Sequence, residues 1–224
     1  VLIPRPETEV LVKTALEQIK NQKSKIKNIA DIGTGSGCVI VSLVKRLQIQ
    51  YLEVSLPREV RLRSIQFYAT DISSATLNVA RKNAKLHGLD KQIIFLKGDL
   101  LKPLKQKPDL IVANLPYLIS PSPFSAQGGS ASGGQGEGMG EVISTLRHEP
   151  SIALAGGQDG LDLYRRLLGQ IKERQWRAVV ILLEIDPRQA IALGKIIKPL
   201  WPKARVSFCL DIHGLKRVAE FKIA

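Results

Sequence analysis

The tetrapeptide Asn114-Leu115-Pro116-Tyr117 follows a short apolar run and carries groups suited to a planar nitrogen. The Asn114 side-chain oxygen and the Leu115 carbonyl are two acceptors that can orient an NH2 group, and Tyr117 can pack on the planar group. Because resonance holds the lone pair of an amide or an exocyclic amine, such a nitrogen reacts only when it is well placed. Orientation alone can recover roughly 7 to 11 kcal/mol of a barrier. The four residues are therefore predicted to be catalytic and to bind the substrate.

A glycine-rich loop precedes this tetrapeptide, between a strand-like run and an apolar helix-like run. Its residues Gly33, Thr34, Gly35, Ser36 and Gly37 let a ligand approach backbone N–H groups. A dinucleotide fold requires G-x-G-x-x-G, but here the third glycine comes one residue early. The shorter loop, with an acid two residues before it, suits S-adenosylmethionine, whose sulfonium methyl group an oriented nitrogen can accept. A structural turn or a site for another nucleotide are the other interpretations.

Two acids follow the next two predicted strands. Asp71 comes just past the run 65–69, where a carboxylate can accept hydrogen bonds from ribose hydroxyls. Asp99 follows the run 92–96 and is placed to accept from the adenine amino group, with Leu100 against the ring. Each acid alone also suits a strand-end cap or a turn. Their order behind the glycine loop favours a cofactor site that includes Asp71, Asp99, Leu100 and Asn114.

The elements that must position these residues alternate between short β-branched runs and helical patterns, which predicts an α/β fold. The predicted helices are 7–20, 38–44, 74–86, one around 163–171 and one that begins at 187, and the predicted strands are 28–32, 65–69, 92–96, 109–113 and 178–184. Asp186 is the predicted N-cap of the last helix, in a capping box with Gln189. The alternating segments 205–210 and 217–223 predict an antiparallel hairpin at the edge of a mostly parallel, seven-stranded sheet.

Residues 1–224 are interpreted as one domain, of which 1–22 form an opening helical region. Two stretches look inserted, 48–64 and the Gly/Ser-rich 121–140, and the second is expected to be flexible. Two cysteines in apolar runs and three scattered histidines offer no metal-ligand spacing. The longest apolar run, 178–183, is too short to cross a bilayer, so we expect a cytoplasmic, metal-free protein that is not membrane-bound.

The formal net charge of +13 raises the question of a polyanionic partner. The positive residues are spread over polar stretches between the apolar runs. One interpretation is a set of solvated loops in a basic protein. The other is a surface that faces the ribosome or RNA.

With these motifs the chain is similar to the HemK/PrmC protein-(glutamine-N5) methyltransferases, which act on the Gly-Gly-Gln tripeptide of peptide chain release factors. The matching stretches are Ile3-Pro4-Arg5-Pro6-Glu7-Thr8-Glu9, Asp31 to Gly37, Asp71, Asn114 to Tyr117, His148-Glu149-Pro150, Ala153-Leu154, Gly156 to Leu161, Tyr164-Arg165 and Leu183-Glu184-Ile185. The opening stretch and the Gly-Gly-x-Asp-Gly-Leu stretch are more specific to the family than the glycine loop.

The resemblance implies a Rossmann-like class I fold, S-adenosylmethionine as cofactor, release factors as partners and a monomer. It implies that Pro4, Arg5, Pro6 and Thr8 border the substrate pocket. It also implies a small helical N-terminal domain ahead of the Ile-Pro-Arg-Pro stretch, and we expect that residues 1–224 do not include it.

The chain departs from the family pattern at three places. Leu115 stands where the family usually has the first proline of Asn-Pro-Pro-Tyr, Asp186 stands where it commonly has glycine, and 121–140 enlarges a loop. We expect these departures to affect substrate choice more than the reaction.

Two alternatives remain at this stage. The first is a ribosomal RNA adenine N6-methyltransferase, since Asn-Leu-Pro-Tyr also resembles the motif of those enzymes and the charge suits RNA. The second is a non-catalytic module that binds the cofactor. The glycine spacing disfavours a dehydrogenase.

Overall fold

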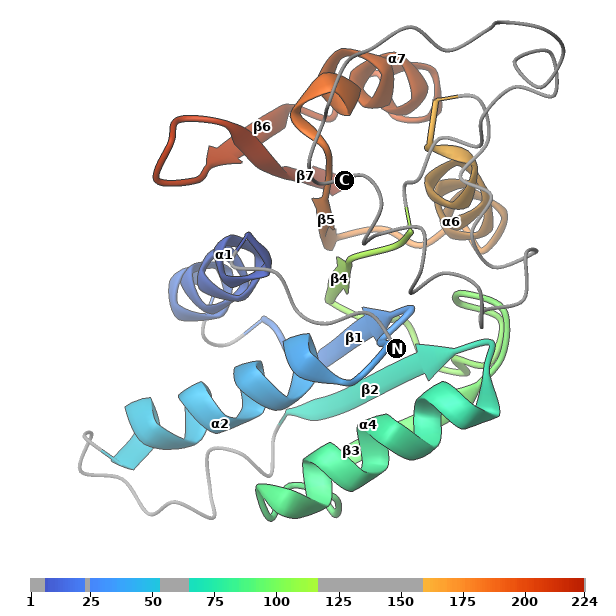
Figure 1. Ribbon diagram of the computed structural model, residues 1–224. Coiled ribbons are helices and arrows are strands. Elements are labelled where there is room, and N and C mark those ends of the chain that lie inside the picture. The colour runs from blue at the N-terminus through green and yellow to red at the C-terminus, as the bar shows by residue number, and fades with distance from the viewer. Residues whose placement is uncertain (1–6, 23–24, 53–64, 117–158, 224) are drawn as a thin grey trace, which may run out of the picture.

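The computed structural model describes residues 7–22, 25–52, 65–116 and 159–223, and a seven-stranded sheet lies at its centre (Figure 1). The strands are β1 (Asn28–Ile32), β2 (Gln66–Asp71), β3 (Ile93–Lys97), β4 (Leu110–Ala113), β5 (Val179–Glu184), β6 (Val206–Leu210) and β7 (Lys216–Ile223). Their order in the sheet is β3-β2-β1-β4-β5-β7-β6. Strands β3, β2, β1, β4 and β5, which are neighbours in that order, are parallel to one another. Strand β7 runs antiparallel to both of its neighbours, β5 and β6. The predicted fold class is confirmed.

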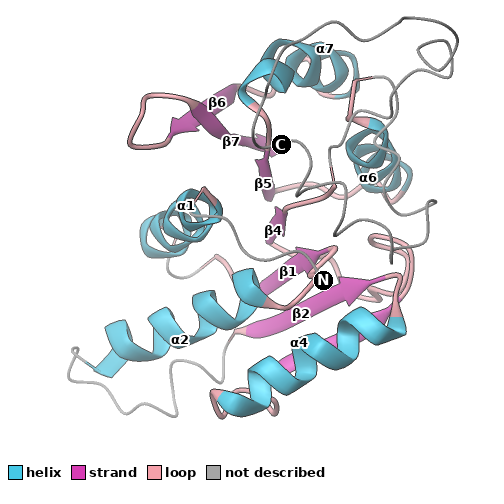
Figure 2. Ribbon diagram, viewed as in Figure 1, coloured by secondary structure: helices cyan, strands magenta, loops and turns pink. Residues whose placement is uncertain are grey.

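Helices cover both faces of this sheet (Figure 2). They are α1 (Thr8–Asn21), α2 (Cys38–Leu52), α4 (Ser74–Leu86), α6 (Asp162–Glu173) and α7 (Ala190–Leu200), and a 3-10 turn, η4 (Pro187–Gln189), precedes α7. Helices α1, α2 and α4 pack on one face, and α6 and α7 pack on the other, so two apolar clusters flank the sheet. Strands β4 and β5 are buried along their whole length, as expected of central strands covered on both faces.

Most predicted boundaries agree with the structure to within two residues, and β1 and α4 agree at both ends. The C-terminal end of α4 is marked by Gly88, whose φ of +67° is the left-handed conformation of a helix C′ residue. The predicted end of α2 is wrong, because the helix continues to Leu52 and takes in part of the stretch interpreted as an insertion. Its apolar run stops at Val44, but Leu47 is still buried while Lys45 and Arg46 are exposed. The helix is therefore amphipathic beyond its apolar run.

The capping box before α7 is confirmed. The Asp186 carboxylate accepts a hydrogen bond from the Arg188 backbone N–H at 2.9 Å, and the Asp186 N–H donates to Gln189 Oε1 at 3.1 Å. Asp186 thus caps the turn into α7, and a glycine at this position has no side chain that could accept the hydrogen bond from Arg188. The predicted insertion at 121–140 lies outside the described residues. Among the described helices, none has the length and apolarity needed to cross a membrane.

One carboxylate is buried at the end of β1, directly before the glycine loop. Asp31 is 1% exposed, and its Oδ2 accepts a hydrogen bond from the Thr34 hydroxyl at 2.6 Å. Burial raises the pKa of Asp31 to about 7, and the hydrogen bond from Thr34 opposes that rise only in part. Asp31 therefore exchanges its proton close to neutral pH in the folded protein.

This pKa predicts a pH-dependent stability. Between pH 3.8 and about 7 the unfolded chain has lost the Asp31 proton and the folded chain has kept it. The unfolded state then binds fewer protons, so the free energy of unfolding should fall as pH rises, by up to about 1.4 kcal/mol per pH unit, and level off above pH 7. Urea unfolding of the wild type and of Asp31→Asn across this range measures the difference. The exposed Asp90→Asn is the control, and wild-type and Asp31→Asn curves that run parallel would contradict the prediction.

Candidate active site

The predicted functional residues meet where the strand order reverses. Strand β1 pairs with β2 on one side and β4 on the other, and the connections lead outward in opposite directions from these two strands. Open α/β sheets bind ligands at the carboxyl ends of the strands at such a point. The register pairs Ile32 with Ala113 of β4 and with Thr70 of β2. Gly33, Asp71 and Asn114, each the end or next residue of its strand, therefore lie at the same edge.

The glycine loop is in contact with the tip of β4. Gly33 has a φ of +70°, a conformation that other residues adopt only with strain, and a Cβ added to it would lie 2.5 Å from Leu115 Cδ2, so the Leu115 side chain would have to shift. Gly37 has a φ of +79°, and its added Cβ would lie 3.1 Å from Ala80 of α4. The loop is thus packed between the tetrapeptide and α4. Gly35 also has a positive φ, +58°.

Hydrogen bonds hold the loop in this position. The Thr34 N–H donates to the Thr70 carbonyl of β2 at 2.9 Å, which adds to the bond between the Thr34 hydroxyl and Asp31. From the α4 side, the Asn83 amide donates to the Ser36 carbonyl at 2.9 Å. Three hydrogen bonds thus fix the loop at two of its residues, Thr34 and Ser36.

Asp71 joins the loop to the start of α4. Its Oδ2 accepts a hydrogen bond from the Gly35 N–H at 3.1 Å, and its Oδ1 accepts from the Ser73 N–H at 2.9 Å. Ser73 is the N-cap of α4, with its hydroxyl accepting from the Thr76 N–H at 3.2 Å. The carboxylate predicted to bind ribose thus lies beside the glycine loop, and Asp71 is half-buried.

Asp99 and Leu100 lie in the turn after β3, at the same edge. Burial alone would raise the pKa of Asp99, but hydrogen bonds and charge from Lys102 and Arg166 outweigh it and hold the pKa below its usual value. Gln170 of α6 also donates to Asp99 Oδ2 at 3.4 Å and accepts from the Leu101 N–H at 2.9 Å. Asp99 thus ties the turn after β3 to α6. Its contact with adenine stays a prediction. Leu100 has a φ of +52° and is 8% exposed.

Asn114 is oriented by a residue far away in the sequence. Its Nδ2 donates a hydrogen bond to Thr8 Oγ1 at 3.1 Å, and Thr8 is buried at the first turn of α1. Since the amide nitrogen is bound to Thr8, the Asn114 Oδ1 oxygen is turned the other way and left to accept from another group. The sequence resemblance placed Thr8 at the pocket border, but no spacing signal pointed to this contact across 106 positions.

Leu115 is held by a hydrogen bond that a proline cannot make. Its N–H donates to the Tyr164 hydroxyl at 3.4 Å, and that hydroxyl donates to the Glu184 carbonyl at the end of β5. Tyr164 and Leu115 are both buried, at 1% and 3% exposed. The departure from the family's proline therefore adds a donor that ties the tetrapeptide to α6 and β5. Sequence reasoning placed Tyr164 on a helix but did not find this role.

Several predicted site residues lie outside the described part of the chain. These are Pro4, Arg5 and Pro6 on the N-terminal side and Tyr117 after the tetrapeptide. Pro116, the last described residue of the tetrapeptide, is exposed at the sheet edge. Their roles remain predictions.

Within the described ranges, no group of three His, Cys, Asp or Glu side chains is arranged to hold a metal ion. Burial raises the pKa of the Cys38 thiol, directly after the loop, so this thiol is not an activated nucleophile. The polar groups at this edge are the backbone N–H groups of the loop, the carboxylates of Asp31 and Asp71, which are acceptors, and the oriented amide of Asn114. This set fits S-adenosylmethionine, because the left-handed glycines open the backbone to a ligand and the acids suit ribose hydroxyls and a cationic amino acid.

Known proteins resemble the chain both in sequence and in fold. The model of the family described as ribosomal protein L11 methyltransferase (PrmA) matches residues 7–119, the half that contains the glycine loop and the tetrapeptide. A release factor glutamine methyltransferase from Bacillus cereus is 32% identical over 97% of this chain and 67% of its own length. Relatives with the same name reach 41% identity. The chain spans about two thirds of the length of these relatives.

Solved structures share the fold. A ribosomal protein L11 methylase from Lactobacillus delbrueckii subsp. bulgaricus has a TM-score of 0.58 and 17% identity, covering 99% of this chain and 80% of its own. The N-terminal domain of human METTL16, solved with SAH, has a TM-score of 0.51 and 18% identity, covering 100% and 73%. Both carry the class I methyltransferase architecture described above. Since the release factor methyltransferases agree along nearly the whole chain and the L11 family only over its first half, this protein belongs to the release factor glutamine methyltransferase family, HemK/PrmC.

Proposed function

We propose that this chain transfers the methyl group of S-adenosylmethionine to the side-chain amide nitrogen of the glutamine in the Gly-Gly-Gln motif of peptide chain release factors. The observation that carries the proposal is the contact between Leu115 and Gly33, in which the predicted substrate tetrapeptide lies directly against the predicted cofactor loop. The names of the full-length relatives support glutamine in a release factor as the acceptor.

The chain's own residues orient the acceptor. When bound, S-adenosylmethionine would supply a methyl group on a positively charged sulfur, which keeps the electron pair of the broken C–S bond. The substrate nitrogen would form the new N–C bond and give up one of its two protons to solvent. Asn114 Oδ1 and the Leu115 carbonyl accept the two N–H groups of the substrate amide, so the nitrogen lone pair lies perpendicular to those bonds. The Thr8 hydroxyl keeps Asn114 in this orientation, and the Tyr164 hydroxyl keeps the Leu115 backbone in place. Positioning of this kind is the main source of rate acceleration when no strong base takes part.

Further parts of the proposal concern the setting of the reaction. Residues 1–224 act as one methyltransferase domain, and as a monomer, because Gly33, Asp71, Asn114 and Thr8 all come from one chain. Both cysteines are free thiols, which suits the reducing conditions of the cytoplasm.

Mass spectrometry of a matched release factor after incubation with the protein and S-adenosylmethionine tests the proposal. We expect the mass of one methyl group to be added to the glutamine of Gly-Gly-Gln. A release factor with that glutamine replaced by alanine should stay unmodified. Parallel incubations with ribosomal RNA and with ribosomal protein L11 complete the design. Label that enters RNA or L11 and not the release factor would replace the proposal with one of the competing activities.

Substitutions at Asp71 and Asn114 should separate cofactor binding from transfer. Asp71→Ala removes the acceptor predicted to bind ribose, and the loss of one or two charge-assisted hydrogen bonds should raise the cofactor Kd about 10- to 100-fold. Asn114→Ala should leave the cofactor Kd within a few-fold and lower kcat about 100-fold or more. Calorimetry gives the Kd and single-turnover transfer gives the rate. Equal loss of cofactor affinity in both variants would show that the assigned roles are wrong.

Thr8 should act as a positioning residue. Thr8→Val keeps the shape of the side chain but removes the oxygen to which Asn114 donates, so the amide can rotate. We expect kcat to fall about 10-fold, an unchanged cofactor Kd, and recovery in Thr8→Ser, which retains the hydroxyl. The matched control is Thr14→Val, in the same helix and equally buried, whose hydroxyl donates to the Val10 carbonyl at 2.9 Å. A rate loss as large in the control would assign the effect to packing of α1.

A further inference from the structure

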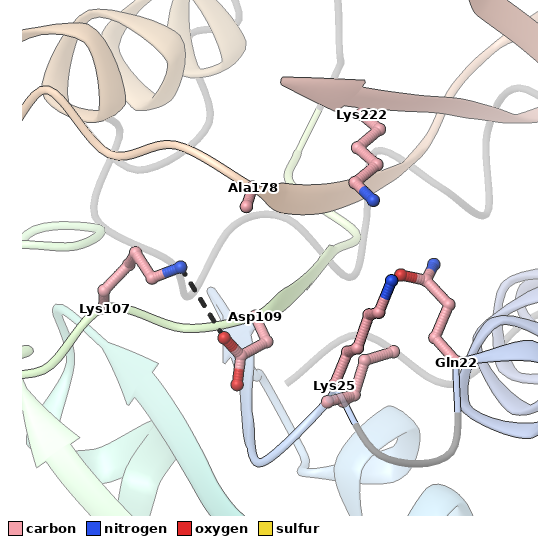
Figure 3. A pocket seen from close by; sticks show the side chains of 7 residues that line it. Gln22, Lys25, Lys107, Asp109, Ala178 and Lys222 are labelled. Carbon is pink, nitrogen blue, oxygen red and sulfur yellow. Dashed lines mark ion pairs between the residues drawn. The ribbon is translucent and has the colours of Figure 1, made fainter. Parts of the chain in front are cut away.

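A cavity lies at the opposite edge of the sheet from the candidate active site. It has a volume of about 270 Å³ and is lined mainly by Lys25, Lys107 and Lys222 with Gln22 and Asp109 (Figure 3). Lys25 and Lys107 precede β1 and β4, and Lys222 is next to the last residue of β7, so the three lysines gather at the amino-terminal edge of the parallel strands. Five residues of β1, roughly 3.3 Å each, separate this edge from the glycine loop.

The single acid in this cavity is already neutralised. Asp109 Oδ2 accepts from the backbone N–H groups of Lys27 and Asn28 at 2.9 and 3.0 Å. Its Oδ1 lies 3.6 Å from Lys107 Nζ, which also donates to the Arg177 carbonyl at 2.9 Å. One carboxylate is thus shared by a lysine and two N–H groups. It contributes little negative charge to offset the remaining lysines.

Lys25 and Lys222 carry the uncompensated charge. Both side chains are exposed, and neither ammonium group has a hydrogen bond or an ion pair with the described part of the chain, although the Lys25 backbone N–H donates to the Gln22 carbonyl. Figure 3 shows Lys222 reaching from β7 toward the side of the cavity where Lys25 and Gln22 lie, with Lys107 on the far side of Asp109. Two ammonium groups therefore border a hollow large enough for a phosphate-sized anion.

The same edge carries more positive charge on either side of the cavity. Further exposed basic residues lie within the three positions before the start of a strand. They are Lys27, Lys91, Arg177, Lys203 and Arg205. The acids at equivalent described positions are Asp90 and the neutralised Asp109. Because neighbouring strands lie roughly 4.8 Å apart, these residues form a row of positive charge along the sheet edge.

We propose that this basic edge binds the phosphate backbone of RNA, with one phosphate held between Lys25 and Lys222. A row of charge fits a linear polyanion, and release of counterions from phosphates supplies the free energy. The release factor does not fit here, because its glutamine must reach the carboxyl ends of the strands on the opposite edge. The choice of RNA over DNA rests on the proposed function, since the proposed substrate is a translation factor.

Binding of a short, fluorescently labelled RNA, followed by anisotropy at several salt concentrations, tests the proposal without any methyl transfer. The test variant is Lys25→Gln with Lys222→Gln. The control variant, Lys13→Gln with Lys82→Gln, removes the same charge from exposed positions on α1 and α4. Loss of the one phosphate held between the two lysines should reduce the magnitude of the slope of log K against log salt by about 0.7, which corresponds to about 5-fold weaker binding at roughly 0.1 M salt. The control variant should leave the slope unchanged and weaken binding by less than about 2-fold.

Three results would overturn the proposal. The first is an equal loss of RNA affinity in the test and control variants. The second is no RNA binding by the wild type at low salt. The third is a test variant that still binds RNA but captures less release factor. The last would assign the edge to a protein partner. Thermal unfolding checks that both variants fold. Methyl transfer to the release factor should be unchanged in the test variant, so failure of the proposed activity and failure of RNA binding are read separately.

Discussion

The site depends on the contact of Leu115 with Gly33, across the two strands where the sheet reverses its order. A side chain at position 33 would occupy the space that Leu115 Cδ2 fills, at 2.5 Å from an added Cβ. The missing Cβ therefore allows the close approach of the glycine loop and the tetrapeptide, the two segments predicted to bind cofactor and substrate. Methyl transfer needs its two reactants in contact and aligned, and here the backbone of two adjacent parallel strands provides the alignment.

At position 115 of the tetrapeptide, a hydrogen bond restrains the backbone where the family usually has a proline ring. A proline at position 115 limits the backbone by its ring and has no N–H. Leucine allows more conformations, but its N–H reaches the Tyr164 hydroxyl, which is bound in turn to the carbonyl of Glu184. At position 115 the hydrogen bond to Tyr164 therefore restrains the backbone where a proline ring would otherwise do so.

Charge is divided between the two edges of the sheet. Asp31, Asp71 and Asp99 gather at the carboxyl ends of the strands, where a cationic cofactor is expected. The amino-terminal edge carries exposed lysines and arginines, and its Asp109 is neutralised. Part of the net charge of +13 therefore lies along this edge, while Lys102 and Arg166 lie beside Asp99 at the other. A positively charged protein can hold a cation at one edge and a polyanion at the other because about the length of a strand separates the two.

The sequence by itself determined the class of fold, the order of its elements and the identity of the loop, acids and tetrapeptide. These rest on local patterns, namely apolar periodicity, glycine spacing and capping residues, as at Asp186 and Gly88. Only the tertiary structure decided that Thr8 orients Asn114, that Tyr164 holds Leu115, and that Lys25 and Lys222 meet at one cavity. Each of these contacts joins residues separated by 49 or more positions, and strand pairing brings them together. No local pattern records such a distance, because it is set by the order of strands in the sheet.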